Sequence, residues 1–134
     1  MTSADGSPTR VPDELLRAFE VPDLQVRPAR VDPGPPAPGA TRLEFRVRPQ
    51  ELDPMNHVNN AVYVDYLEEA ILAAGGGDVL GRIPRRYQVE YLAPAPAGAR
   101  LESVAWPEPA GDADGWSYRL REDSRDLFVA RVEA

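Results

Sequence analysis

The 134-residue chain has no cysteine, no lysine and only one histidine, His57. The absence of cysteine excludes disulfide bonds, a thiol nucleophile and thiolate metal ligands. Because zinc sites draw several ligands from histidine and cysteine, a single histidine argues against such a site, and we expect no metal and no other cofactor. Any catalytic chemistry must therefore come from carboxylates, hydroxyls, amides, arginines or His57.

Two further absences concern partners and location. No apolar run approaches the roughly 20 residues of a membrane span, and the polar N-terminus lacks the hydrophobic region of a signal peptide. The 15 basic residues, all arginine, are outnumbered by 22 acidic ones, and the net charge of −7 argues against general nucleic-acid binding. We expect a cytoplasmic protein that binds neither membranes nor nucleic acid.

Prolines are concentrated in the first 39 residues, which contain eight of the 15. This composition predicts an extended and largely mobile N-terminal extension over residues 1–39, without a core of its own. One short helix is expected near residues 13–19, where Asp13 can cap it and its apolar side chains, including Leu15 and Phe19, can pack on the domain surface. Residues 40–134 then form one domain.

A long amphipathic helix is predicted to begin at Asn59 or Asn60, whose side chains can accept hydrogen bonds from the free amides of a first helical turn. It should end at the glycine run 75–77, because glycine readily adopts the left-handed conformation found at helix ends. Apolar residues recur between these limits at three- and four-residue spacing, so one face should be buried. They are Val62, Tyr63, Tyr66, Leu67, Ala70, Ile71 and Ala74.

Five segments have the sequence pattern of β-strands, one before the helix and four after it. Polar turns near residues 112–115 and 122–125 suit antiparallel hairpins. An α+β fold follows, in which a curved antiparallel sheet wraps around the single long helix and buries its apolar face. The candidate strands are 42–48, 87–91, 100–106, 116–120 and 127–132.

The segment joining the first strand to the helix carries a motif. Asp53 lies four residues before His57, which opens the run His57-Val58-Asn59-Asn60, and Tyr63 follows inside the helix. This pattern resembles the hotdog-fold acyl thioesterases, in particular the C-terminal hotdog half of fatty acyl-ACP thioesterases. The run also occurs in single-hotdog thioesterases related to the 4-hydroxybenzoyl-CoA enzyme. The resemblance spans about residues 11–106 and implies a single hotdog domain.

The resemblance implies hydrolysis of an acyl thioester carried on acyl carrier protein or coenzyme A. Asp53 would act as a general base toward water or as a nucleophile. His57 would bind substrate or water, orient Asp53, or protonate the leaving thiolate. Backbone amides at the positive end of the helix would polarise the thioester carbonyl. The candidate substrate-binding residues are Val58, Asn59, Asn60 and Tyr63.

The chain also departs from the acyl-ACP thioesterase pattern. Met55 stands where that family has a catalytic asparagine, and Pro94 and Ala95 stand where it has a glutamate and a cysteine. The first hotdog half is absent, so the resemblance implies pairing with another hotdog copy, most simply as a homodimer. A non-catalytic acyl-binding or partner subunit is therefore an alternative function. A hydratase or dehydratase is another, although Asn59 stands where its second aspartate is expected.

Several candidate residues also have structural interpretations. Asp53 can brace its loop, His57 can be a structural hydrogen-bonding residue, and Asn59 can serve first as a helix cap. Glu68 and Glu69 occur where some hotdog thioesterases carry a helical catalytic carboxylate, but a solvated face or a dimer contact explains them as well. The arginines at 82, 85 and 86 can bind phosphates of a carrier or form a solvated cluster.

Overall fold

The computed structural model describes residues 12–18, 30–109 and 111–134. Helix α1 (Asp13–Ala18) confirms the short helix expected in the N-terminal extension. Its Leu15 side chain is 43% exposed, in contrast to the expected packing on the domain, and Phe19 lies outside the described residues. Within the described part of the chain, no helix is long and apolar enough to cross a membrane.

Helix α2 (Asn60–Ala73) is the long helix that the apolar spacing predicts. Asn59 is its N-cap, and the Asn59 side chain accepts a hydrogen bond from the amide of Ala61 at 3.0 Å. The helix ends at Ala74 and Gly75, where Gly75 has a φ of +93° that favours glycine. Both predicted limits of the helix are therefore confirmed.

A further short helix, α3 (Gly77–Gly81), begins within the glycine run and was not predicted. The turn before it passes very close to the core, because a Cβ atom on Gly76 would lie 2.6 Å from the Trp116 ring. Glycine is therefore required here for close packing as well as for ending α2.

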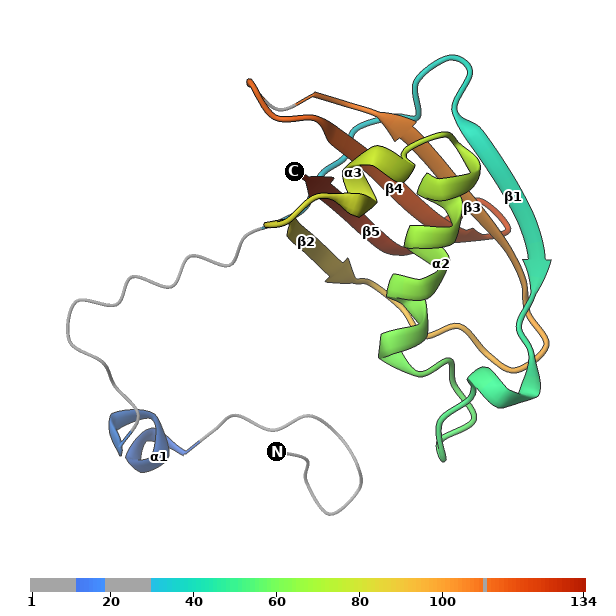
Figure 1. Cartoon of the computed structure of the whole chain (residues 1–134). Coiled ribbons are helices and arrows are strands. Elements are labelled where there is room, and N and C mark those ends of the chain that lie inside the picture. Colours follow the sequence, from blue (N-terminus) through green and yellow to red (C-terminus); the bar gives the residue numbers. More distant parts are fainter. Residues whose placement is uncertain (1–11, 19–29, 110) are drawn as a thin grey trace.

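The five strands form one antiparallel sheet in the order β1-β3-β4-β5-β2. Figure 1 shows α2 lying across one face of this sheet, which confirms the expected α+β architecture. The two-residue turn between β4 and β5 contains Asp123 and Ser124, both with positive φ, as a tight hairpin requires. Strands β1 and β2 are the two edges. The strands are β1 (Thr41–Arg46), β2 (Arg86–Tyr91), β3 (Arg100–Pro107), β4 (Gly115–Glu122) and β5 (Arg125–Glu133).

The core lies between α2 and the sheet face that it covers. Tyr63 and Tyr66 of α2 are both buried, and their rings contact aromatic residues of the sheet. The ring centroids of Tyr63 and Phe128 are 5.4 Å apart, and those of Tyr66 and Phe45 are 4.5 Å apart. The predicted apolar face of the helix is thus the buried one, and these contacts fix the start of α2 against the sheet.

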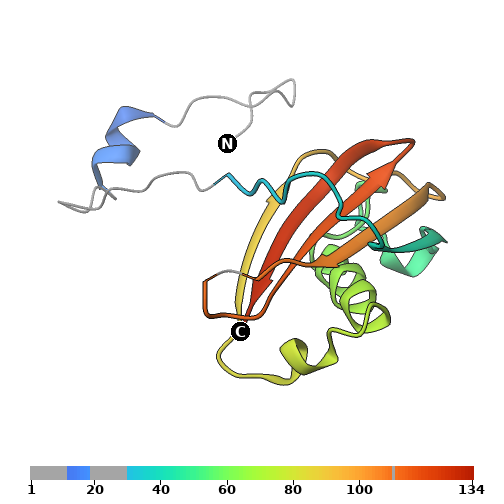
Figure 2. The same cartoon turned by 90° about the horizontal axis from the view of Figure 1, so that it is seen from above.

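Residues 31–39, which we call the strap, cross the opposite face of the sheet before β1 begins (Figure 2). The amide of Val31 donates to the Glu90 carboxylate at 3.1 Å, and the Arg119 guanidinium donates to the carbonyl of Gly34 at 2.9 Å. Val31 is buried, so this part of the proline-rich extension is packed rather than mobile. A domain boundary near residue 40 stays a prediction. Buried apolar residues of this sheet face are Val104, Trp106 and Val129.

Candidate active site

The loop between β1 and α2 carries the predicted acid and the histidine. After a short 3-10 helix, Pro49–Glu51, the chain makes a tight turn. The amide of Asp53 donates to the carbonyl of His57 at 2.8 Å, and the amide of Asn56 donates to the carbonyl of Asp53 at 3.0 Å. Asn56 has a φ of +62°, a conformation that asparagine tolerates better than most residues. The turn therefore fixes the backbones of Asp53 and His57 beside each other.

The two carboxylate oxygens of Asp53 have different environments. Oδ1 accepts hydrogen bonds from the amides of Met55 at 2.9 Å and His57 at 3.1 Å. Oδ2 has no hydrogen-bond partner among the described residues, and the side chain is partly exposed. One oxygen thus braces the turn, as the structural interpretation predicts, and the other is uncommitted.

Hydrogen bonding distinguishes the candidate amides at the start of α2. The amide of Val58 donates to the carbonyl of Ala95 at 3.0 Å, and that of Asn59 donates to the carbonyl of Glu51 at 2.9 Å. The Asn60 amide has no acceptor within the described ranges. Among these three amides, Asn60 is therefore the one left to bind a ligand at the positive end of the helix.

A pocket of about 280 Å³ brings most of the candidate residues together. Part of its lining comes from the loop and the start of α2, namely Asp53, His57, Val58, Asn60 and Tyr63. Asn59, which caps the helix, is not part of the lining. The rest of the lining comes from the chain around the end of β2, namely Tyr91, Leu92, Ala93 and Pro94.

Tyr91 and Ala95 connect the chain around the end of β2 to α2. The Tyr91 hydroxyl donates to the carbonyl of Asn60 at 3.0 Å, and its ring stacks edge-on against Tyr63 with centroids 5.4 Å apart. The Ala95 amide donates to the Tyr63 hydroxyl at 2.8 Å. Burial raises the pKa of Tyr63, although the hydrogen bond from Ala95 opposes that shift. No sequence pattern predicts these pairings, since they join residues about thirty positions apart.

His57 lines the pocket, and its imidazole has no hydrogen-bond partner in the described part of the chain. In the same ranges no group of three histidine, cysteine, aspartate or glutamate side chains is arranged to hold a metal ion. At the positions of the family's glutamate and cysteine, Pro94 lines the pocket and Ala95 is buried behind Tyr63. Asp53 is the one acidic side chain in this pocket lining.

Glu51, two residues before Asp53, was missed by the sequence analysis. Its side chain is buried and accepts hydrogen bonds from the Arg48 backbone amide at 2.7 Å, the Arg48 guanidinium at 2.6 Å and the Tyr66 hydroxyl at 2.7 Å. Burial alone would raise the pKa of Glu51, but these hydrogen bonds outweigh it and hold that pKa below its ordinary value. A sequence pattern could have identified Glu51 as a capping residue. Pro49 stands at the first position of a helical turn and Glu51 at the third, which is a recognisable capping pattern.

The other charged candidates have partners outside the pocket. Glu68 accepts a hydrogen bond from Tyr87 at 2.5 Å, and burial together with this bond raises the pKa of Tyr87 to about 12. Arg82 pairs with Asp114. None of these side chains lines the pocket around Asp53. The remaining arginines of the cluster are Arg85, above the Tyr87 ring, and Arg86, 4.0 Å from Glu133.

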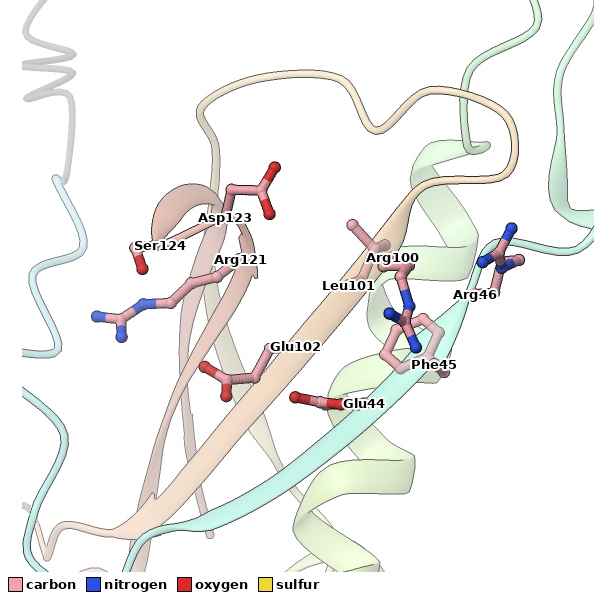
Figure 3. Close-up of a pocket in the computed structure, with 9 residues that line it drawn as sticks. All are labelled: Glu44, Phe45, Arg46, Arg100, Leu101, Glu102, Arg121, Asp123 and Ser124. Atoms are coloured by element: carbon pink, nitrogen blue, oxygen red, sulfur yellow. The ribbon is translucent and has the colours of Figure 1, made fainter.

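A larger pocket of about 460 Å³ lies by β1, β3 and the β4–β5 turn (Figure 3). Its lining is rich in charges of both signs, including Arg46, Arg100 and Asp123. Some of these charges are neutralised locally, since Glu102 of the lining pairs with Arg42 at 2.8 Å. It contains none of the predicted site residues, and we therefore assign the candidate active site to the smaller pocket around Asp53.

Comparison with protein families identifies the family of the chain and supports the fold. The model of the acyl-ACP thioesterase C-terminal domain matches residues 36–131, which include both the Asp53 loop and all five strands up to residue 131. The chain belongs to the acyl-ACP thioesterase C-terminal domain family. It is thus a hotdog-fold hydrolase of acyl thioesters, as the motif around His57 predicts. No curated protein matches the chain in sequence.

Solved structures share the fold at low sequence identity. A protein from Lactobacillus plantarum named as an oleoyl thioesterase has a TM-score of 0.73 and 20% identity, over 97% of this chain and 51% of its own. A Thermus thermophilus thioesterase solved with coenzyme A and zinc has a TM-score of 0.58 and 22% identity, over 69% of this chain and 74% of its own. The chain therefore corresponds in length to about half of the first of these proteins.

Proposed function

We propose that this chain hydrolyses an acyl thioester in the pocket around Asp53, with Asp53 as the group that activates water. The proposal rests mainly on one observation. Asp53 and Asn60 line the same pocket. Within the described part of the chain, one carboxylate oxygen of Asp53 and the backbone amide of Asn60 have no hydrogen-bond partner. A base and an amide donor at a helix start are the two groups that acyl transfer to water needs most.

In the proposed reaction, Asp53 takes a proton from water while the water oxygen forms a bond to the thioester carbon. The carbonyl oxygen becomes negatively charged and accepts a hydrogen bond from the Asn60 amide, where the helix end contributes about half a positive charge. The carbon–sulfur bond then breaks, the thiolate leaves with the electron pair, and the proton on Asp53 returns to it. The products are one carboxylic acid and one thiol.

Asp53 can alternatively attack the carbonyl itself and form an anhydride that water hydrolyses. A single turnover in water enriched in oxygen-18 can reveal this second route. Hydrolysis of the anhydride at its aspartyl carbonyl leaves heavy oxygen in the Asp53 carboxylate, detectable as a mass increase of the peptide that contains it, whereas hydrolysis at the acyl carbonyl labels only the acid product. The general-base route leaves the mass of that peptide unchanged. In either route His57 binds the water or the substrate.

The proposed substrate is an acyl group on a phosphopantetheine arm, which acyl carrier protein and coenzyme A have in common. The family match favours an acyl group on acyl carrier protein. Because one structural neighbour was solved with coenzyme A, acyl-coenzyme A thioesters should also be tested as substrates. Val58 and Tyr63 are proposed to contact the substrate because they line the pocket. Asn59 contributes indirectly by capping α2.

The chain is further proposed to form a homodimer through the edge strand β2. Three apolar side chains in or beside this edge strand are exposed: Val89 by 36%, Tyr91 by 44% and Leu92 by 48%. Tyr91 and Leu92 also line the pocket, so a second copy on this edge would cover its open side. Sedimentation velocity is expected to report a dimer for the wild type, and a purely monomeric but active protein would contradict this part of the proposal.

The hydrolase proposal is tested by thiol release from short, long and aromatic acyl thioesters on carrier protein and on coenzyme A. Wild type is compared with Asp53→Asn, and thermal unfolding verifies that both are folded. Turnover of at least one substrate class that the variant loses supports the proposal. Equal and negligible rates, with acyl ligands still binding by calorimetry, would instead favour a non-catalytic acyl-binding subunit.

A further inference from the structure

Tyr63 is the most buried polar side chain in the wall of the Asp53 pocket. It is only 1% exposed, yet it lines the pocket together with Asp53 and Asn60. Its hydroxyl oxygen accepts a hydrogen bond from the amide of Ala95 at 2.8 Å. In the described ranges the hydroxyl has no acceptor for its own proton. A buried phenol that accepts a bond from the protein but donates none has one directed interaction left to make.

The surroundings hold this hydroxyl in place. The Tyr63 ring packs between Tyr91 and Phe128, with centroid distances of 5.4 Å to each. The peptide of Ala95 is itself fixed, because its carbonyl accepts from the amide of Val58, at the start of the helix, at 3.0 Å. The Tyr63 hydroxyl and the chain at the start of α2 are thus held by the same Ala95 peptide, and a fixed position of the donors is what makes electrostatic stabilisation effective.

We propose that the Tyr63 hydroxyl is a catalytic hydrogen-bond donor to the thioester carbonyl oxygen, acting beside the Asn60 amide. This inference rests on the proposed function and assigns a role to a residue that would otherwise be only a pocket wall. The bond accepted from Ala95 polarises the hydroxyl and strengthens it as a donor. Burial keeps the phenol protonated by raising its pKa, with the nearby Asp53 charge acting in the same direction.

The first test compares Tyr63→Phe with Tyr118→Phe. Tyr118 is also buried and hydrogen-bonded, to Ser103 at 2.7 Å, but it lies on β4 and does not line the pocket, so it controls for the loss of a buried hydroxyl. Tyr63→Phe is expected to lower kcat by roughly 10²-fold, as removal of one oxyanion donor typically does, with little change in KM. Tyr118→Phe is expected to keep the wild-type kcat. Equal kcat values for both variants would overturn the proposal.

The second test measures recognition of the carbonyl without catalysis. The probes are S-(2-oxododecyl)pantetheine, which carries a ketone in place of the thioester, and S-dodecylpantetheine, which has no carbonyl. Calorimetry should show that wild type and Tyr118→Phe prefer the ketone, and that Tyr63→Phe loses about tenfold of this preference, the equivalent of one hydrogen bond. An unchanged preference in Tyr63→Phe, or no preference in the wild type, would overturn the proposal.

A donor role toward Asp53 rather than the substrate would have a different signature. The acidic limb of the pH profile of kcat/KM would then shift in Tyr63→Phe while the ketone preference stayed intact, and this result would also overturn the proposal. If Tyr63→Phe fails to fold, 3-fluorotyrosine at position 63 keeps the hydroxyl and makes it a stronger donor. Stronger ketone preference is then expected, and an unchanged preference contradicts the proposal.

These readouts separate the two proposals. Loss of turnover in Asp53→Asn combined with normal turnover in Tyr63→Phe would reject only the role of Tyr63. Absence of turnover in every protein, combined with a ketone preference that depends on the Tyr63 hydroxyl, would reject hydrolysis and retain Tyr63 as the residue that binds the carbonyl.

Discussion

Glu51 and Asp53 are two carboxylates on the same short loop, and the protein uses them differently. Glu51 is only 5% exposed, and both of its oxygens accept hydrogen bonds from Arg48, one of them also from Tyr66. Asp53 is partly exposed and commits one oxygen to the turn, leaving the other without a partner among the described residues. Glu51 therefore has hydrogen-bond donors on both of its oxygens, whereas Asp53 has them on only one among the described residues.

This difference is the one expected between a structural carboxylate and the proposed catalytic one. A saturated carboxylate ties the loop to α2 through Tyr66 and has no lone pair left for a substrate. Among the described residues, the second oxygen of Asp53 and the backbone amide of Asn60 have no partner. Such a carboxylate can still accept a proton from water. In this loop, burial and hydrogen bonding therefore favour Asp53 over Glu51 as the proposed reactive group, a choice that the residue type alone does not make.

Asp53→Asn is expected to have the largest effect on activity. Asparagine can keep the two hydrogen bonds from Met55 and His57 through its amide oxygen, but it cannot take a proton from water. Turnover should fall by about 10²–10⁴-fold, the typical contribution of a general base, with a melting temperature close to that of the wild type. Thiol release and thermal unfolding on the same samples give both quantities.

Asp53→Ala sharpens this prediction because it also removes the brace. The variant should be as inactive as Asp53→Asn. Its free energy of unfolding should be lower than that of Asp53→Asn by about 1–2 kcal/mol, because it loses the two partly solvent-exposed hydrogen bonds from the amides of Met55 and His57. Urea denaturation of both variants measures the difference. Equal stability would mean that Oδ1 does not brace the turn.

Glu51→Gln is expected to affect stability rather than chemistry. Both oxygens of Glu51 accept hydrogen bonds from Arg48, and one also accepts from Tyr66. Glutamine replaces one of these oxygens by an NH2 group, which cannot accept, so the free energy of unfolding should fall by about 1–3 kcal/mol. The turnover of the folded fraction should stay near that of the wild type. Glu44→Gln, on the exposed side of β1, is a matched control in which stability should not change.

The pH dependence of stability gives the smallest expected effect. The pKa of Glu51 is held below its ordinary value of 4.5, so its contribution is fully present above that pH and is lost as the pH falls through the lower, folded-state pKa. The stability difference between wild type and Glu51→Gln should therefore shrink as acid is added below about pH 4.5. Urea denaturation across this range measures it, and a difference independent of pH would contradict the assignment.

Much of the fold could be predicted because its signals are local. The periodicity of residues such as Tyr63 and Leu67 identifies α2, and the alternation around Phe45 identifies β1. The strand order could not be predicted, since the pairing of β1 with β3 and of β2 with β5 joins distant segments. The hydrogen bond between Val31 and Glu90 could not be predicted for the same reason, because the two residues are 59 positions apart.

The candidate site was predictable to a similar extent. Asp53, His57 and Asn60 lie close together in sequence, so a motif could identify them, and the structure brings them to one pocket. The use of each amide could not be predicted, because the acceptors of Val58 and Asn59 are carbonyls of Ala95 and Glu51, positioned by folding. From the sequence, the amides of Val58, Asn59 and Asn60 were equal candidates for binding the carbonyl oxygen. Only the tertiary structure shows that, of these three, the first two already have acceptors.

The most direct test of the account compares Asp53→Asn with Glu51→Gln, as thiol release per folded molecule on the best wild-type substrate. We expect Asp53→Asn to be folded and nearly inactive, whereas Glu51→Gln should be less stable but retain turnover close to that of the wild type. The reverse result, an active Asp53→Asn and a folded but inactive Glu51→Gln, would contradict the role proposed for Asp53.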